Sequence, residues 1–211
     1  MVSASDFIAP CCFSSVVLFF VCIIFVVVLF SFMKKKRFRS ALQYVASQTG
    51  CSFDPGGWFR SPRVSGNYRN RNLLIEVYRE HHHHQHHGRS STSSTEYTKI
   101  QVNHTATLPL EMEVYPGTFF SAIGKKLGMQ DIQTGNPEFD KVFVVKGSDE
   151  SVVRQILDLE LQAKLLKLRA SVHVYPSMVY SRMIGLVSDK DFLLNIVNAM
   201  VDIADKLERL R

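Results

Sequence analysis

The chain has 211 residues, 46% of them hydrophobic, and its formal net charge of +6 gives a pI near 9.2. Residues 34–71 carry nine bases and one acid, whereas residues 72–211 carry 16 bases and 17 acids. A nucleic-acid footprint would place the excess charge on the folded domain. The charge is instead confined to one short stretch, and we expect no nucleic-acid partner.

An apolar segment lies near the N-terminus. Residues 11–32 are 22 positions without a charge, a proline or a glycine. As a helix rising about 1.5 Å per residue, the segment would be about 33 Å long, enough to cross a hydrocarbon core of about 30 Å. A cleaved signal peptide would need basic residues in front of a shorter apolar stretch, and only Asp6 is charged here. We therefore predict that residues 1–33 are an uncleaved, single-pass transmembrane anchor.

A basic collar follows the apolar segment directly. Because basic residues that flank a span are retained in the cytoplasm, we predict that the N-terminus lies outside and the C-terminal domain in the cytoplasm. We assign residues 34–63 to this collar and a linker, with a short helix at Ser40–Ser47 and Gly50 as its stop. The lipid bilayer is the expected partner of the collar, whose residues are Lys34, Lys35, Lys36, Arg37 and Arg39.

Strand patterns begin at Val64. The sequence VSGNY, a polar Asn-Arg-Asn turn and LLIEVYRE predict a hairpin. The tract from residue 81 to residue 95 is rich in His, Ser and Thr and has no periodicity, so we predict a loop between two antiparallel strands. The strand YTKIQVNH follows, and then ATLPLEMEVY. The alternation of this second segment places Glu111 and Glu113 on a wet face, and its buried face holds Leu108, Leu110, Met112 and Val114.

The C-terminal half alternates between helix and strand patterns. We predict a short helix over residues 118–127, a strand over residues 141–146 and a long helix capped by Ser148. Two strands follow, ASVHVY and MVYSRMIGLV, and then a terminal helix whose capping box is Ser188-x-x-Asp191. Residues 64–211 should therefore form an α+β domain, an antiparallel sheet covered by two long helices.

These motifs support a resemblance. The VSGNYRNR hairpin, the tract GMQDIQTGNPEFDKVFVV and the amphipathic helix after it resemble a family of prokaryotic membrane-anchored domains of unknown function. The resemblance covers most of residues 40–210 and implies the architecture above. It implies no activity, and the His tract looks like an insertion peculiar to this chain.

Two groups of residues could carry chemistry. The first is the His tract, because imidazoles bind zinc, nickel or copper at neutral pH. A flexible loop lacks rigid ligand geometry, and adventitious binding is therefore the favoured interpretation. Glu138 and Asp140 would share a face of a strand and could act as an acid–base pair, although a turn anchored by Phe139 is favoured. We expect no cofactor. The candidate metal ligands are His81, His82, His83, His84, His86 and His87.

The terminal helix carries an apolar seam with the spacing of a coiled coil. Packing within its own domain is the favoured interpretation, and self-association or binding of a helical partner is the alternative. The favoured function is a membrane-anchored cytoplasmic binding or scaffolding module rather than an enzyme. The alternatives are a membrane-bound hydrolase that uses Glu138 and Asp140, and a metal-handling protein that uses the His tract. The seam residues are Leu193, Ile196, Met200, Ile203, Leu207 and Leu210.

Overall fold

The computed structural model describes residues 5–57, 60–86, 89–106, 109–117 and 130–210, with the side chains at 5–17, 82–91 and 130 left out. The chain divides into two compact units, Met1–Arg37 and Phe38–Arg211. Helix α1, Ser5–Thr49, contributes to both units.

The first unit is the apolar part of α1. Its large hydrophobic side chains between Leu18 and Met33 are 43% to 66% exposed. Within the described residues, α1 is the one helix that is long and apolar enough to cross a membrane. The predicted N-terminal apolar helix is therefore confirmed.

The last turns of α1 belong to the second unit. Phe38, Leu42 and Val45 are at most 1% exposed, and their spacing of three and four residues places them on one face of the helix. The helix ends at Thr49, before Gly50, whose φ of +68° favours glycine. The compact unit thus begins at Phe38, whereas we predicted a domain beginning at residue 64. The difference arises because the stretch predicted as a linker carries its own buried stripe.

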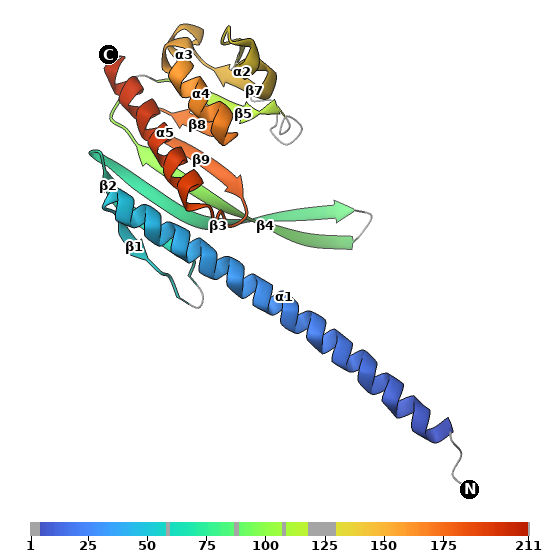
Figure 1. The fold of residues 1–211 in the computed structure, drawn as a ribbon. Helices are drawn as coiled ribbons and strands as arrows, with labels where there is room; N and C mark the ends of the chain where they lie inside the picture. The colour runs from blue at the N-terminus through green and yellow to red at the C-terminus, as the bar shows by residue number, and fades with distance from the viewer. Residues whose placement is uncertain (1–4, 58–59, 87–88, 107–108, 118–129, 211) are drawn as a thin grey trace. The chain divides into compact units, whose positions relative to one another are not determined.

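The second unit is built on a nine-stranded antiparallel sheet with the order β1-β2-β3-β4-β9-β8-β5-β7-β6 (Figure 1). The predicted α+β class is confirmed. The strands are β1 Ser52–Asp54, β2 Arg63–Tyr68, β3 Arg71–His86, β4 Arg89–Asn103, β5 Met112–Pro116, β6 Gln130–Ile132, β7 Phe143–Gly147, β8 Val172–Tyr175 and β9 Met178–Ile184. The helices after α1 are α2 Pro137–Val142, α3 Glu150–Ile156, α4 Leu159–Leu168 and α5 Lys190–Arg209.

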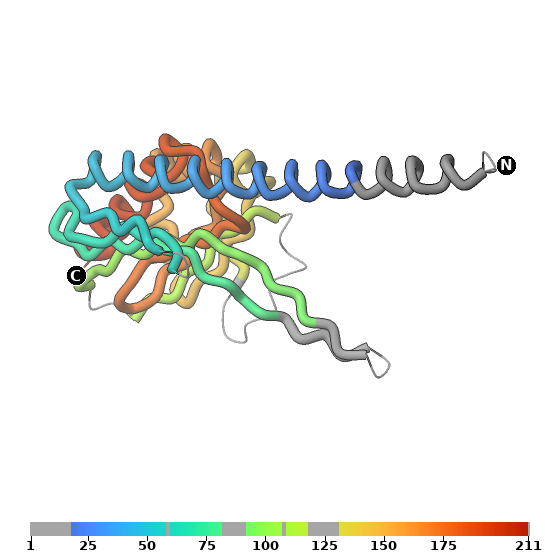
Figure 2. Tube along the Cα trace, turned by 90° about the horizontal axis from the view of Figure 1, so that it is seen from below, coloured from blue at the N-terminus to red at the C-terminus, as the bar shows by residue number. Residues whose placement is uncertain are grey.

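One face of the sheet is apolar and carries the helices. Val64, Ile75 and Ile100 are paired across β2, β3 and β4, and all are 0% exposed. Helix α5 packs on β4 and β9, and its first residue, Lys190, lies over the ring of Tyr44 in α1. Figure 2 shows α5 and the last turns of α1 on the same side of the strands. The core is therefore a single layer between the sheet and the helices.

The predicted pair of long helices is only partly matched. The first is interrupted at Leu157, and Asp158 caps the new helix α4 by accepting a hydrogen bond from the backbone N–H of Leu161 at 3.0 Å. Asp149 rather than Ser148 caps α3, and Asp189 rather than Ser188 caps α5. Aspartate competes strongly with serine as an N-cap residue, which explains each shift by one position.

The predicted loop over residues 81–95 is wrong. Residues 81–86 and 89–95 extend β3 and β4 into a two-stranded ribbon, paired in register from His81 opposite Ser94 to His86 opposite Arg89 (Figure 1). Serine, threonine and histidine have no apolar periodicity, but a hairpin ladder needs only backbone hydrogen bonds. The pairing already established at Leu73–Glu80 sets the register for the continuation.

Two other local predictions need correction. The strand expected over residues 141–146 begins only at Phe143, because Asn136 caps the short helix α2 and Pro137 occupies its first turn. Glu113, expected on a wet face, is 3% exposed. The helix predicted over residues 118–127 lies outside the described residues.

Candidate functional site

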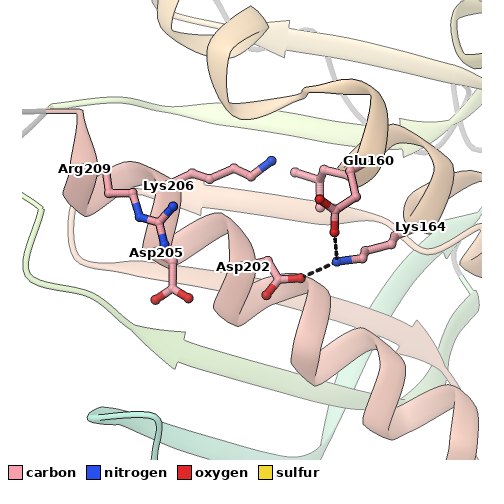
Figure 3. A pocket seen from close by; sticks show the side chains of 7 residues that line it. Glu160, Lys164, Asp202, Asp205, Lys206 and Arg209 are labelled. Atoms are coloured by element: carbon pink, nitrogen blue, oxygen red, sulfur yellow. Dashed lines mark hydrogen bonds and ion pairs between the residues drawn. The ribbon is translucent and has the colours of Figure 1, made fainter.

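A charged groove lies between α4 and α5 (Figure 3). At its centre, the Lys164 ammonium donates hydrogen bonds to Glu160 at 2.7 Å and to Asp202 at 2.8 Å. Lys206 of α5 pairs with Asp158 at the start of α4. The pairs of Lys164 with Asp202 and of Lys206 with Asp158 therefore fasten α4 to α5.

The β2–β3 hairpin is fastened to α5. Its two-residue turn, Arg69 and Asn70, has positive φ at both positions, which a type I′ hairpin requires. Tyr68 donates a hydrogen bond to Asn198 at 2.9 Å. Arg71 is 9% exposed and bridges Asp205 at 2.6 Å and Glu208 at 2.5 Å. The VSGNYRNR motif thus has a structural role.

Glu208 also holds the chain after β4. Its carboxylate accepts hydrogen bonds from the backbone N–H of Thr105 at 2.9 Å and from the Thr105 hydroxyl at 3.1 Å. Desolvation alone would raise the pKa of this carboxyl, but the two hydrogen bonds and the charge of Arg71 outweigh it and lower the pKa. The ionised form of Glu208 is therefore part of the folded structure.

A second hollow, the aromatic cavity, lies where β4, β8 and β9 meet the start of α5. Its volume is about 340 Å³. Tyr115 and Ala170 are 1% and 5% exposed and form its floor. Its wall combines cations and rings: the Arg182 guanidinium lies 5.1 Å from the centre of the Tyr97 ring and donates a hydrogen bond to the Tyr78 hydroxyl at 3.3 Å. Chemically, this is a site with both charged and apolar contacts.

A row of polar side chains crosses the sheet beside the cavity. Glu113 is paired with His173 in the register of β5 and β8, and Oε1 of Glu113 lies 3.6 Å from Nδ1 of His173. Glu113 is also opposite Lys146 of β7, which lies 3.8 Å from Asp131. The ring of His173 stacks on Tyr180 with centroids 4.7 Å apart. The face without the described helices is therefore polar at its centre.

The predicted seam residues lie inside the domain. Five of them, from Leu193 to Leu207, are at most 1% exposed and belong to the hydrophobic core, and Leu210 is half-buried against it. Their position corresponds to packing within the domain. Binding of a helical partner through this seam stays an untested prediction.

The other predicted site residues are placed as follows. Residues 81–86 of the His tract form the outer part of β3, where His81 is exposed and the side chains beyond it are outside the description. The predicted ligand His87 lies outside the described residues. Groups of three or more metal-ligating side chains are absent from the described residues. The collar residues from Lys34 to Arg37 and Arg39 are exposed in α1, and Lys34 lies 4.6 Å from the centre of the Phe30 ring.

Glu138 and Asp140 are not brought together as an acid–base pair. They lie two positions apart in helix α2, where such residues do not face each other. Asp140 accepts hydrogen bonds from the backbone N–H groups of Thr134 and Gly135, at 2.9 Å and 3.2 Å. Phe139 is 0% exposed. The motif therefore forms a short capped helix with Phe139 in the core, where a turn anchored by Phe139 was predicted.

Sequence reasoning missed the residues of the aromatic cavity. Tyr97, Arg169 and Arg182 stand far apart in the chain, and no spacing connects them. One signal was available, because Arg182 is the single charged residue of the strand MVYSRMI. Arg169 gave no such signal, since the left-handed conformation in which α4 ends, at φ +50°, is seen only in the structure.

Comparison with known proteins places the chain as follows. The family described as "Protein of unknown function (DUF3137)" matches residues 94–211, more than half of the chain. No curated protein matches its sequence. The crystal structure of the mycobacterial trehalose monomycolate transport factor A, TtfA, is similar with a TM-score of 0.54 and 10% identity, covering 84% of this chain and 96% of that one. This likeness shows a shared fold.

Proposed function

Because the chain belongs to the DUF3137 family, whose function is unknown, we propose its role from its own geometry: a membrane-anchored module that binds a partner at the bilayer surface rather than catalysing a reaction. The observation that carries the proposal is the uncovered apolar helix. The most apolar window of α1 is 0% buried, and its mean hydropathy is 2.4. A core helix of a soluble protein would be covered by its own domain.

The energetics support insertion into a bilayer. Thirteen of the residues from Leu18 to Met33 are Leu, Ile, Phe or Val. At about −0.3 to −0.6 kcal/mol each on the insertion scale, they contribute roughly −4 to −8 kcal/mol. Exposure of these side chains to water would forfeit that free energy. A bilayer is the environment in which the helix is stable.

The finer parts of the proposal concern orientation and partners. The collar Lys34–Arg39 favours a cytoplasmic C-terminal domain by the positive-inside rule. The fold neighbour is described as a transport factor, and this description supports a role in holding or handing over a partner. The aromatic cavity supplies a place for binding within the domain.

Membrane fractionation with topology tagging tests the proposal. The full chain should stay in the membrane pellet through an alkaline carbonate wash and enter solution only with detergent. A chain lacking residues 1–33 should be soluble. An alkaline phosphatase fused after Arg211 should be inactive, because it works only outside the cytoplasm. Release of the full chain by carbonate would refute anchoring, and an active phosphatase would reverse the orientation.

A further inference from the structure

We propose that the aromatic cavity binds an anionic amphiphile, a molecule with one phosphate or carboxylate group and a short apolar body. The residues that carry the argument are Tyr97, Tyr115, Arg169, Arg182, Ile184 and Phe192. The inference depends on this lining alone and does not require the chain to be membrane-anchored.

The charges of the lining select an anion. Two guanidinium groups, those of Arg169 and Arg182, line the cavity, and no acid does so among the lining residues that the structure describes. Glu80 lies 3.6 Å from Arg182 and compensates part of its charge. Arg169 forms no ion pair with any described residue and is exposed at the rim. A bound anion would be the counter-charge of Arg169.

The geometry of Arg182 favours a phosphate or a carboxylate. A guanidinium matches these groups with two parallel N–H donors. Stacking on Tyr97 and the hydrogen bond to Tyr78 hold the Arg182 side chain in place before any ligand arrives. Less rotamer entropy is then lost on binding. The site is preorganised on three strands, β3, β4 and β9.

The cavity is also lined by apolar side chains. Phe192 and Met183 line it, and Ile184 at its rim is 66% exposed. A small inorganic anion would leave these side chains facing water, whereas an amphiphile would cover them. The volume of about 340 Å³ lies at the lower end of the range for ligand pockets, about 300–1,000 Å³. It suits a headgroup with short apolar chains rather than a long-chain membrane lipid.

Methyl NMR on the full chain tests the proposal. The protein is reconstituted in nanodiscs of phosphatidylcholine with ¹³C-labelled methionine methyl groups, and the Met183 signal is assigned with Met183→Leu. Titration with dihexanoyl phosphatidylglycerol should shift the Met183 signal to saturation. Arg169→Gln and Arg182→Gln should each weaken the apparent Kd by about tenfold or more, because each removes a charge-assisted hydrogen bond. Ile184→Trp, which narrows the rim, should weaken binding without removing a charge.

Three controls separate the outcomes. Arg154→Gln removes an exposed cation of α3 that pairs with Glu150 outside the cavity, and it should leave the Kd unchanged. Dihexanoyl phosphatidylcholine should give no saturable shift, and inorganic phosphate should bind more weakly than the anionic lipid. Equal binding of the zwitterionic lipid, or unchanged binding by Arg169→Gln, would overturn the proposal. If inorganic phosphate bound as tightly as the anionic lipid, the claim that the apolar lining contributes to binding would be overturned. These results do not depend on whether the full chain stays in the membrane pellet, so failure of this proposal can be told apart from failure of the proposed membrane anchoring.

Discussion

At the scale of single residues, the domain depends on a few polar side chains that are nearly buried. Arg71 is the clearest example, because its guanidinium is 9% exposed and contacts two carboxylates of α5, Asp205 and Glu208. A pair that is largely removed from water leaves an uncompensated charge when one partner is lost. The hairpin and the terminal helix are therefore coupled through one side chain.

Substitution of Arg71 by Gln should lower the free energy of unfolding by about 2–3 kcal/mol, because two acids lose their counter-charge in a half-buried site. Chemical denaturation of the detergent-solubilised chain measures the change. The matched control is Arg79→Gln, whose pair with Glu96 is 57% exposed on the arginine side. This control should change stability by no more than about 0.5 kcal/mol. Equal effects of the two variants would contradict the role assigned to Arg71.

We predict that His104 makes the stability of the domain depend on pH. Its Nε2 lies 2.9 Å from the carbonyl oxygen of Tyr175, and its Nδ1 accepts a hydrogen bond from the backbone N–H of Ala106. Only the neutral ring with its proton on Nε2 satisfies both contacts. Burial lowers the pKa of His104 below its usual 6.5, although the Tyr175 contact opposes this.

The sign of the effect follows from proton linkage. Between the lowered pKa and 6.5 the unfolded chain binds more protons at His104 than the folded chain does, so stability falls as the pH falls. We expect the thermal midpoint of unfolding to be lower at about pH 5.5 than at about pH 7.5. His104→Gln, which keeps a donor and an acceptor, should flatten this part of the profile. A variant with the same pH dependence as the parent would assign the effect to another group.

At the scale of elements, the last turns of α1 act as a core helix of the domain. A chain that begins at Phe38 should fold, whereas a chain that begins at Gly50 should not. The latter loses three large buried side chains, Phe38, Leu42 and Val45. Core truncations of this kind cost about 2–5 kcal/mol each, and their sum is comparable to the whole stability of a domain, about 5–15 kcal/mol.

Circular dichroism and thermal unfolding of the two fragments check this expectation. The point variant Leu42→Ala should lower the free energy of unfolding by about 2–4 kcal/mol, and the exposed neighbour Gln43 serves as the control, with a change within about 0.5 kcal/mol on substitution by Ala. A cooperative melt of the fragment from Gly50 would show that α1 is dispensable for folding.

The outer ribbon of β3 and β4 should be dispensable. Residues 81–86 of β3 and residues 89–94 of β4 pair only with each other in the described sheet. Replacing residues 81–94 by Asn-Gly joins Glu80 to Thr95, which are register partners, through a two-residue hairpin turn. The thermal midpoint should change by less than about 5 °C. A drop of tens of degrees in the variant would contradict this expectation. If removal of metal from the parent gave the same drop, and zinc reversed it, the tract would be a structural metal site.

The accuracy of sequence reasoning also varied at the scale of elements. Elements with a strong apolar signal were predicted well, namely the continuous apolar run of α1, the hairpin at Val64 and the periodic helix α5. The ribbon was missed because backbone pairing, not side-chain pattern, continues it past Glu80. The burial of Glu113 was missed because its partners Lys146 and His173 come from distant strands. The aromatic cavity was missed for the same reason, since the sequence does not state which strands are neighbours.

At the scale of the whole molecule, the order of the strands determines when during synthesis the sheet can be completed. Strand β9 lies between β4 and β8 in the sheet, yet it begins at Met178, 75 residues after β4 ends at Asn103. At about 5–20 residues per second, a ribosome needs roughly 4–15 s to synthesise that interval. During this time the edge of β4 has no permanent neighbour, while the apolar helix has already emerged. The nascent domain is therefore incompletely folded during this interval. It is most prone to aggregation and to binding by chaperones before the β8–β9 hairpin is synthesised.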